Sequence, residues 1–207
     1  MSIKAVVFDY GGVICFPPDA TAERRLAELT GLSVETLNGL NRKYRGEYDR
    51  GTFDGGAYYK YILSQAGLFP DEGRLEEIAR ADNEGWKRIN GETLALMRDI
   101  KAAGFRVGIL SNMPRDFLAW ARKNIPVFTG LDAAVFSCEY NLIKPEAAIY
   151  EKLREKTGFD YGEIVFFDDL PDNVQKAGEL GIKSFVWKGP AAAREELKKI
   201  GGAFEVL

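Results

Sequence analysis

The chain has 207 residues, of which 28 are basic and 31 acidic, and its formal net charge is −3 with no histidine. The basic residues form no stripe, so we expect neither nucleic acid nor a membrane surface as a partner. The lack of histidine excludes serine–histidine and cysteine–histidine nucleophile systems and histidine-ligated zinc. Any catalysis must therefore use carboxylates, lysine, hydroxyl groups or a hard metal ion.

The two cysteines, Cys15 and Cys138, form no CxxC pair. Isolated cysteines in an acidic chain are typical of reduced thiols in a cytoplasm, and we expect Cys15 to be a bystander. A strand is predicted within a few residues of the N-terminus, so we expect no signal peptide. No apolar stretch approaches the roughly 20 residues that span a bilayer. We therefore expect a cytoplasmic protein.

The predicted elements begin with an apolar strand at residues 3–8, which runs into Asp9. Roughly 95 residues separate this strand from the next, whereas a whole βαβ unit takes about 30. The intervening segment keeps the spacing of amphipathic helices, which we predict at 20–30, 33–48, 54–66 and 71–86. Placed directly after Asp9, such an insertion would stand over the carboxyl edge of the sheet as a lid.

From residue 91 onward, helices and strands alternate. We predict helices at 92–103, from 114, 145–157, 171–180 and 190–200, and strands at 105–110, 133–137, 164–167 and 183–187. This alternation predicts an α/β fold with a parallel sheet. We divide the chain into a core, residues 1–16 and 88–207, and a helical cap, residues 17–87, with hinges at 17–18 and 83–91.

Polar residues follow three of the predicted strands, at the sheet edge where ligands bind in such folds. Asp9 precedes Gly11 and Gly12, whose backbone N–H groups can approach an anion closely, although a simple turn-forming aspartate fits equally well. Ser111 and Asn112 end the second strand before a predicted helix, and they could hold a phosphate or only cap that helix.

Two further segments suit a phosphate ester held with a metal ion. Lys144 precedes a proline that we expect to open a helix, and its charge could pair with a phosphoryl oxygen and with Asp9; a solvated surface lysine is the alternative. Asp168 and Asp169 end a wholly apolar strand. Two adjacent carboxylates repel each other and need a cation nearby, and oxygen ligands suit Mg²⁺. We therefore favour a Mg²⁺ site over a purely structural role for this pair.

Together the four segments resemble the haloacid dehalogenase superfamily, in order and in spacing. The quoted motifs are Phe8-Asp9-Tyr10-Gly11-Gly12-Val13, Leu110-Ser111-Asn112, Lys144-Pro145 and Phe166-Phe167-Asp168-Asp169-Leu170-Pro171-Asp172-Asn173. The resemblance, closest to phosphatases with an FDxGGV first motif, implies a Rossmann-like sheet with strand order 5-4-1-2-3 and a helical cap. It also implies a Mg²⁺-dependent phosphatase.

The resemblance assigns roles to individual residues. Asp9 would attack phosphorus and form an aspartyl-phosphate that water hydrolyses. The side chains of Asp9 and Asp169 and the carbonyl of Gly11 would hold Mg²⁺, with Asp168 acting through a bound water. The phosphoryl oxygens would be held by Ser111, Asn112, Lys144 and the amides around Gly11 and Gly12.

One position departs from the commonest pattern. Many phosphatases of this superfamily carry an acid/base aspartate two residues after the nucleophile, where this chain has Gly11. General acid/base help is worth roughly 10²–10⁴-fold. The replacement could come from Asp168, Asp172, a cap residue or a metal-bound water, and the sequence alone does not select one.

Two alternative functions stay open at this point. One is a phosphate-binding relative that lost turnover together with its acid/base residue. The other is a metal-independent 2-haloacid dehalogenase, in which Arg42 or Arg45 would bind halide. An acidic pair after the fourth strand argues against the dehalogenase.

The substrate is expected to be a small phosphorylated metabolite, with sugar phosphates foremost, because a lid over the sheet edge restricts access. Four cap residues could contact it: Tyr44, Arg45, Tyr48 and Arg50. The alternative is that the cap aromatics, Trp86 included, pack the lid itself. The sequence carries no sign of the oligomeric state.

Overall fold

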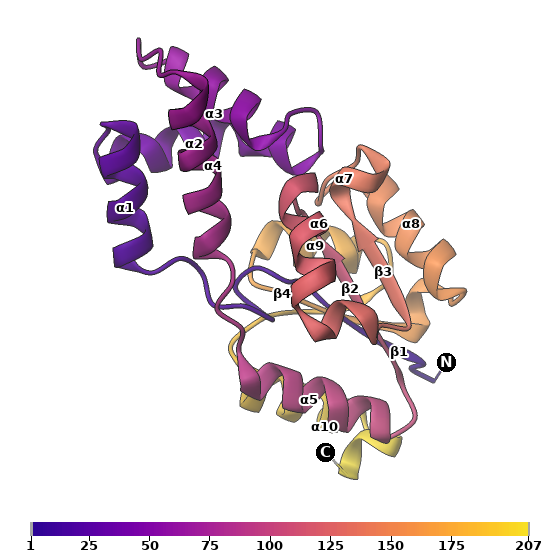
Figure 1. Ribbon diagram of the computed structural model, residues 1–207. Helices are drawn as coiled ribbons and strands as arrows, with labels where there is room; N and C mark the ends of the chain where they lie inside the picture. Colours follow the sequence, from indigo (N-terminus) through magenta and orange to yellow (C-terminus); the bar gives the residue numbers. More distant parts are fainter. Residues whose placement is uncertain (1, 207) are drawn as a thin grey trace.

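The computed structural model describes residues 2–206 and shows a parallel five-stranded sheet flanked by helices, with four helices gathered at one end (Figure 1). The strand order is β3-β2-β1-β4-β5, which is the predicted order read from the opposite edge. The strands are β1 (Ala5–Phe8), β2 (Arg106–Ser111), β3 (Ala133–Phe136), β4 (Ile164–Asp168) and β5 (Lys183–Val186). The α/β fold with a Rossmann-like sheet is confirmed.

The helices of the core follow the predicted pattern within one to three residues at most ends. They are α5 (Gly91–Ala102), α6 (Arg115–Asn124), α7 (Ser137–Tyr140), α8 (Ala147–Thr157), α9 (Pro171–Glu179) and α10 (Pro190–Ile200), with short 3-10 turns η1 (Pro126–Thr129), η2 (Tyr161–Glu163) and η3 (Gly202–Val206). Helix α7 was not predicted, because a single turn is too short to show a helical period.

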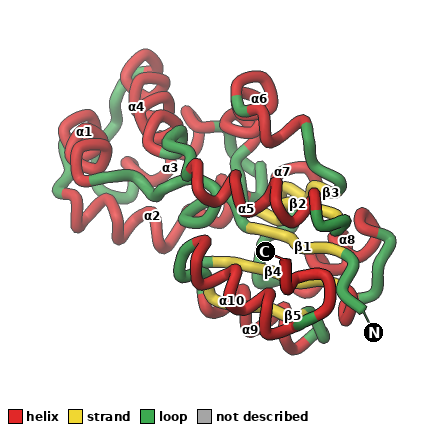
Figure 2. The backbone as a smooth tube through the Cα atoms, turned by 90° about the horizontal axis from the view of Figure 1, so that it is seen from below, coloured by secondary structure: helices red, strands yellow, loops and turns green. Residues whose placement is uncertain are grey.

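The two faces of the sheet are covered by different helices (Figure 2). Along β1, Val6 and Phe8 face the layer formed by α5, α6 and α10, whereas Ala5 and Val7 face α8 and α9. Successive side chains of a strand point to opposite faces, so a strand buried on both sides is apolar throughout. This is the reason that β1, β2 and β4 read as continuous apolar runs.

The segment between β1 and α5 forms four helices with a hydrophobic cluster of their own. They are α1 (Ala20–Thr30), α2 (Val34–Asp49), α3 (Gly55–Ser64) and α4 (Glu72–Gly85). Each begins at a residue whose side chain accepts hydrogen bonds from the first turn, namely Asp19, Ser33, Asp54 and Asp71. Such capping residues mark helix starts in the sequence, which explains why these boundaries were predictable.

Two linkers join the four helices to the core, and they run side by side. Cys15 and Ile89 form an antiparallel bridge. The N–H of Phe16 donates to the carbonyl of Arg88 at 2.8 Å, and Asn90 N–H donates to the carbonyl of residue 14 at 2.9 Å. Burial raises the pKa of the Cys15 thiol to about 12, so this cysteine carries no nucleophilic thiolate.

One predicted boundary is wrong. Pro145 was expected to open a helix, but α8 begins at Ala147 after Glu146, and the Lys144–Pro145 peptide bond is cis. Residues 142–146 instead form a loop, since the backbone of Lys144 is bonded to the side chain of Asn112.

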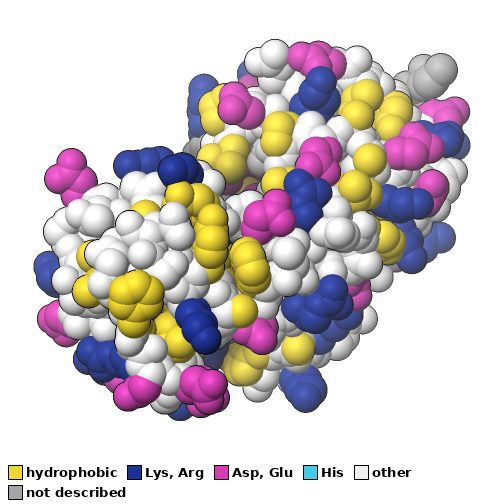
Figure 3. Space-filling model, turned by 90° about the horizontal axis from the view of Figure 1, so that it is seen from above, with side chains coloured by type: hydrophobic (Ala, Val, Ile, Leu, Met, Phe, Trp, Pro, Cys, Tyr) yellow, Lys and Arg dark blue, Asp and Glu magenta, His cyan; other side chains and the backbone are white. Residues whose placement is uncertain are grey.

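Within residues 2–206, no helix has the length and apolar character needed to cross a membrane. On the face drawn in Figure 3, basic and acidic side chains are interspersed with apolar ones, without a large area of one sign.

Candidate functional site

The candidate site lies where β1 and β4 end side by side. The N–H of Asp9 donates to the carbonyl of Phe167 at 2.9 Å, which holds the ends of the two strands together. One oxygen from each of Asp9, Asp168 and Asp169 lies within 4.8 Å of the other two. Three carboxylates at this separation repel one another unless positive charge is close.

Lys144 supplies one such charge from inside the cluster. Its Nζ lies 2.9 Å from Asp9 Oδ1 and donates to Asp168 Oδ2 at 2.6 Å and to the carbonyl of Leu110 at 3.0 Å. An ammonium group has three donors, and these contacts use all of them. Burial lowers the pKa of Lys144, but the two carboxylates raise it above its usual value. The group is therefore charged, and it supplies a single positive charge to a cluster of three carboxyl groups.

The Asp9 carboxylate is buried, and burial shifts its pKa. Burial raises its pKa to about 7; Lys144 acts in the opposite direction, while Asp168 and Asp169 raise the pKa further. Its Oδ1 also accepts the N–H of Tyr10 at 2.7 Å. Among the described residues nothing donates to Oδ2, so this oxygen is available for attack on a ligand or for a metal.

The two carboxylates after β4 differ in their surroundings. Asp168 is fully buried, and both of its oxygens accept hydrogen bonds, from the Leu170 N–H at 2.8 Å and from Asn173 Nδ2 at 3.0 and 3.1 Å. Asp169 is exposed, and burial of part of its surface together with Asp168 raises its pKa. Asp169 can thus bind a metal directly, whereas Asp168 mainly orients Lys144.

The glycines after Asp9 are required by close contacts. Gly12 has a φ of +70°, and a Cβ there would lie 2.5 Å from Asp169 Oδ2. A Cβ at Gly11 would lie 3.2 Å from Cζ3 of Trp86. Both positions therefore favour glycine, the first through backbone conformation and the second through a neighbouring ring.

Ser111 and Asn112 have different roles in the structure. Ser111 is buried, its Oγ makes only a 3.4 Å contact with the Asn112 carbonyl, and it does not line the cavity described below. The Asn112 side chain accepts the Lys144 N–H at 2.8 Å and donates to the Lys144 carbonyl at 3.1 Å. Asn112 therefore fixes the loop that carries the lysine.

A cavity of about 500 Å³ opens above the carboxylates, between the core and the four-helix segment. Asp9, Asp169 and Lys144 form part of its wall, and so do Arg45, Asp49 and Asp82 of the helical segment. Several apolar side chains also line it: Leu26, Leu37, Met113 and Phe117. The site predicted from the sequence and the helical segment thus share one cavity.

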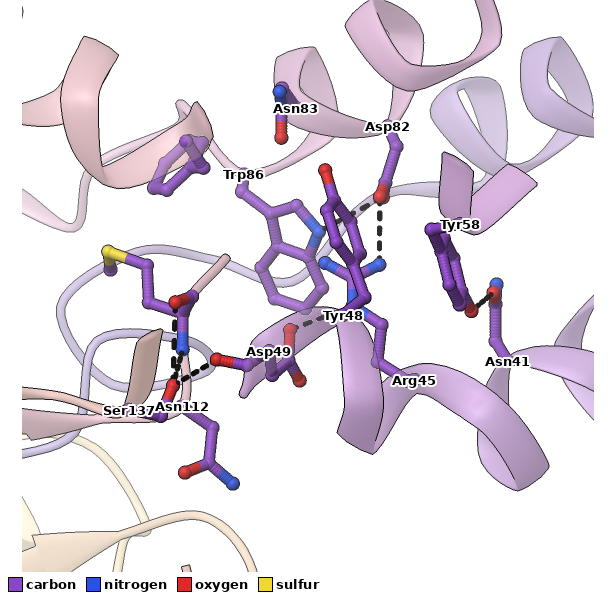
Figure 4. A network of polar contacts seen from close by, with 12 residues as sticks. Asn41, Arg45, Tyr48, Asp49, Tyr58, Asp82, Asn83, Trp86, Asn112 and Ser137 are labelled. Atoms are coloured by element: carbon purple, nitrogen blue, oxygen red, sulfur yellow. Dashed lines mark hydrogen bonds and ion pairs between the residues drawn. The ribbon is translucent and has the colours of Figure 1, made fainter. Parts of the chain in front are cut away.

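The four cap residues singled out in the sequence lie in different places. Arg45 lines the cavity and bonds to Asp49 at 3.0 Å and to Asp82 at 2.8 Å (Figure 4). Tyr48 is buried and stacks on Tyr58. Tyr44 packs edge-on against an aromatic ring of α3, and Arg50 bonds to the core, so neither faces the cavity.

Trp86 does not pack the lid, contrary to one of the alternatives above. It lines the cavity and packs against the core, where the Tyr10 hydroxyl donates to its carbonyl at 2.8 Å. Its indole Nε1 points to Asp82 Oδ1 at 3.4 Å. Sequence reasoning did not place Trp86 or Asp49 in the site, because contacts between distant segments determine their neighbours, and it quoted Asn173 in the fourth motif without giving it a role.

The chain is similar in sequence to known hydrolases. The model of the haloacid dehalogenase-like hydrolases matches residues 3–181. Bifunctional epoxide hydrolase 2 of Mus musculus is 27% identical over 98% of this chain but only 39% of its own length, so this chain spans about two fifths of that relative. Phosphatase MT3486 of Mycobacterium tuberculosis is 25% identical over 90% of this chain and 88% of its own length.

Solved structures share the fold. A HAD family enzyme of Bacteroides thetaiotaomicron in complex with magnesium and inorganic phosphate has a TM-score of 0.68 and 23% identity, over 90% of this chain and 95% of that one. L-2-haloacid dehalogenase of Xanthobacter autotrophicus, with chloropropionic acid covalently bound, has a TM-score of 0.69 and 21% identity, over 99% of this chain and 87% of that one. With the family model covering most of its length, this chain belongs to the haloacid dehalogenase-like hydrolases.

Proposed function

We propose that this protein is a Mg²⁺-dependent hydrolase of small phosphate monoesters that works through an aspartyl-phosphate on Asp9. The observation that carries the proposal is the cluster of Asp9, Asp168 and Asp169 around Lys144 at the bottom of a cavity. The names of two relatives support it: a phosphatase among the curated proteins, and a structural neighbour crystallised with magnesium and phosphate.

The residues fit a divalent cation. Lys144 neutralises one of three carboxylate charges, and Asp169 is exposed to the cavity with no partner that would compete for it among the described residues. Asp9 and Asp169 would hold Mg²⁺ through side-chain oxygens, with the Gly11 carbonyl as a further ligand. When bound, the ion neutralises charge on the phosphoryl group and on the nucleophile.

The chain's own groups would perform the displacement. Asp9 attacks phosphorus through one carboxylate oxygen, and the contacts of Oδ1 with the Tyr10 N–H and Lys144 fix the orientation of the carboxylate. The bond from phosphorus to the leaving oxygen breaks, and a proton must reach that oxygen. The N–H groups of the loop at Gly11 and Gly12 and the charge of Lys144 would stabilise the negative charge that develops on the phosphoryl oxygens. Water then cleaves the aspartyl-phosphate to give inorganic phosphate and free Asp9.

The alternatives predict different products. A 2-haloacid dehalogenase needs no metal, so the acidic cluster disfavours that activity although dehalogenases share the fold. A phosphate-binding relative would bind phosphate with Mg²⁺ without turnover. The experiment is phosphate release from a panel of sugar phosphates and other small esters, with Mg²⁺ or EDTA, together with halide release from 2-chloropropionate.

We expect phosphate release that requires both Mg²⁺ and Asp9, so that Asp9→Asn and EDTA each abolish it. Halide release that persists in EDTA would overturn the proposal in favour of a dehalogenase. Phosphate binding without product from any ester would overturn it in favour of a binding protein.

A further inference from the structure

A phosphatase of this design needs a proton donor for the leaving oxygen, and position 11 cannot supply it. Gly11 has no side chain, and the ring of Trp86 occupies the neighbouring space. The following inference rests on the proposed function, and it concerns which group takes over this role.

Two candidates near the cluster are excluded by their surroundings. Both oxygens of Asp168 already accept hydrogen bonds, and the residue is fully buried. Asp172 does not line the cavity. Besides Asp9 and Asp169, the carboxylates that do line it come from the helical segment: Glu23, Asp49 and Asp82.

Of these three, Glu23 and Asp82 are poorly suited. Glu23 lies in the first turn of α1, and no hydrogen bond or ion pair within residues 2–206 fixes its carboxylate. The two oxygens of Asp82 are engaged, Oδ2 by Arg45 at 2.8 Å and Oδ1 by the Trp86 indole at 3.4 Å.

Asp49 is held at the boundary between the helical segment and the core. It is the last residue of α2, and its carbonyl accepts the Ser137 hydroxyl, which itself accepts the Met113 N–H at 2.8 Å. The residues on both sides are also bonded to the core: the Tyr48 hydroxyl donates to Asp116 at 2.7 and 2.9 Å, and Arg50 pairs with Glu146. The backbone at Asp49 is thus fixed relative to the sheet edge.

The Asp49 carboxylate has one engaged and one available oxygen. Its Oδ1 accepts Arg45 Nε at 3.0 Å, whereas Oδ2 accepts no hydrogen bond from any described residue (Figure 4). The side chain is 16% exposed, and it faces the cavity.

The charges around Asp49 allow it to hold a proton. Burial raises its pKa; Arg45 lowers the pKa, Asp82 raises it and Lys144 lowers it, and the net direction is upward. Its place at the end of α2 acts in the same direction, because the negative end of the helix dipole disfavours a second negative charge. Asp49 also shares the wall of the cavity with Asp9, Lys144 and Asp169.

We propose that Asp49 is the general acid and base of the reaction, delivered to the cavity by α2 in place of the absent side chain at position 11. As Asp9 forms its bond to phosphorus, the protonated carboxyl of Asp49 gives its proton to the leaving oxygen, and the alcohol departs. The Asp49 carboxylate then takes a proton from the water that attacks the aspartyl-phosphate. Inorganic phosphate leaves, and both carboxyl groups return to their starting states.

The test uses the dependence on the leaving group. General acid catalysis matters for an alkyl phosphate, whose leaving alkoxide is strongly basic, and little for para-nitrophenyl phosphate, whose leaving group needs no proton. In Asp49→Asn we expect kcat/KM for n-butyl phosphate to fall by about 10²-fold or more, and for para-nitrophenyl phosphate by less than about tenfold. With the second ester, a burst of nitrophenol should precede slow phosphate release, because water attack has lost its base.

Asp82→Asn is the matched control, since it removes a carboxylate that pairs with the same Arg45. Any loss in that variant should be equal for the two esters. If Asp49→Asn does not show a wild-type melting transition, Asp49→Glu carries the test, because it keeps the charge opposite Arg45 and displaces only the carboxyl group. A lowered ratio of alkyl to aryl rates again supports the proposal.

An equal fall for both esters, or none, overturns the role of Asp49 while leaving the phosphatase intact. If wild-type protein with Mg²⁺ hydrolyses neither ester nor any member of the panel, the proposed function itself fails, and the role of Asp49 falls with it.

Discussion

The indole ring of Trp86 lies against Gly11, so that a Cβ at position 11 would approach Cζ3 of the ring to 3.2 Å. The ring has little freedom to yield, because the Trp86 carbonyl accepts the Tyr10 hydroxyl and its Nε1 points to Asp82. The absence of a side chain at position 11, two residues after Asp9, is therefore explained by the position of the tryptophan ring at the end of α4. A residue from the core and one from the helical segment meet there.

This contact predicts that Gly11→Ala destabilises the protein. Inserting a methyl group into occupied space costs about 1–3 kcal/mol. The cost should largely vanish in a Trp86→Ala background, and a double-mutant cycle from denaturant melts measures the coupling. Gly39→Ala is the control, because a Cβ at Gly39 meets nothing within 4 Å in the middle of α2. It should stabilise by up to about 1 kcal/mol. Additive effects of Gly11→Ala and Trp86→Ala would contradict the steric account.

The acidic cluster predicts stabilisation by Mg²⁺. A ligand that binds only the folded state at about 100 times its Kd adds about 2.7 kcal/mol to the free energy of unfolding, which thermal melts detect. Asp169→Ala should abolish most of the rise in melting temperature, because it removes the exposed carboxylate of the cluster. Asp172→Asn changes an exposed acidic residue of α9 outside the cavity, and this variant should keep the full rise in melting temperature with Mg²⁺. An undiminished rise in Asp169→Ala would place the ion elsewhere.

The buried contacts of Lys144 predict that replacing this residue strongly lowers the free energy of unfolding. Its ammonium group is 1% exposed and bonded to three acceptors, two of them carboxylates. Lys144→Met leaves Asp9 and Asp168 buried without their cation, and breaking a buried pair in this way costs about 3–5 kcal/mol. Denaturant melts at pH 8 measure the loss, and adding Asp168→Asn should recover part of it. A loss below about 1 kcal/mol would mean that solvent compensates these charges.

Asp132 predicts a pH-dependent contribution to stability. Burial raises its pKa, but the Val107 N–H and the charges of Lys101 and Arg106 lower it, and the net result lies below the usual value. A lowered folded-state pKa contributes stability above the unfolded pKa, near 3.9, and this stability is lost as the pH falls through the folded pKa. The free energy of unfolding of the wild type should therefore exceed that of Asp132→Asn by about 1 kcal/mol at pH 7.

This difference should shrink as the pH falls below about 4, near the unfolded pKa of an aspartate. Urea melts at several pH values follow it. A difference that stays constant from pH 7 to pH 3 would attribute the effect to packing rather than to charge.

Much of this architecture could be predicted because local signals and the global fold agree. A few adjacent residues are enough to recognise an apolar strand that ends in Asp9 or Asp168. The same holds for the residues that cap helices, such as Asp19 and Ser33. The convergence of Asp9 and the Asp168–Asp169 pair followed from parallel strands sharing one edge, whereas Lys144, which lies in a loop, was expected there from the proline that follows it and from the family resemblance. Their roles as metal and phosphate ligands remain predictions.

What could not be predicted depends on contacts between distant segments. The side chain of Asn112 looked like a helix cap or a phosphate ligand, but it is bonded to the backbone of Lys144, 32 residues away. In the sequence, Trp86 was one of several aromatic residues expected to pack the lid. It is 75 positions from Gly11 along the chain, but its ring lies beside Gly11 in the fold. Asp49 had no motif at all. Contacts between residues that are distant along the chain produce no periodic pattern in the sequence.

The paired linkers have a consequence for how such a protein diversifies. Residues 14–16 leave the core beside residues 88–90, so the chain exits and returns through one narrow ribbon. The insertion between them begins and ends at the same place, and it can be lengthened, shortened or exchanged without moving any strand of the sheet. Selection can therefore change which side chains of the helical segment line the cavity, while the sheet edge carrying Asp9 and Asp169 stays as it is.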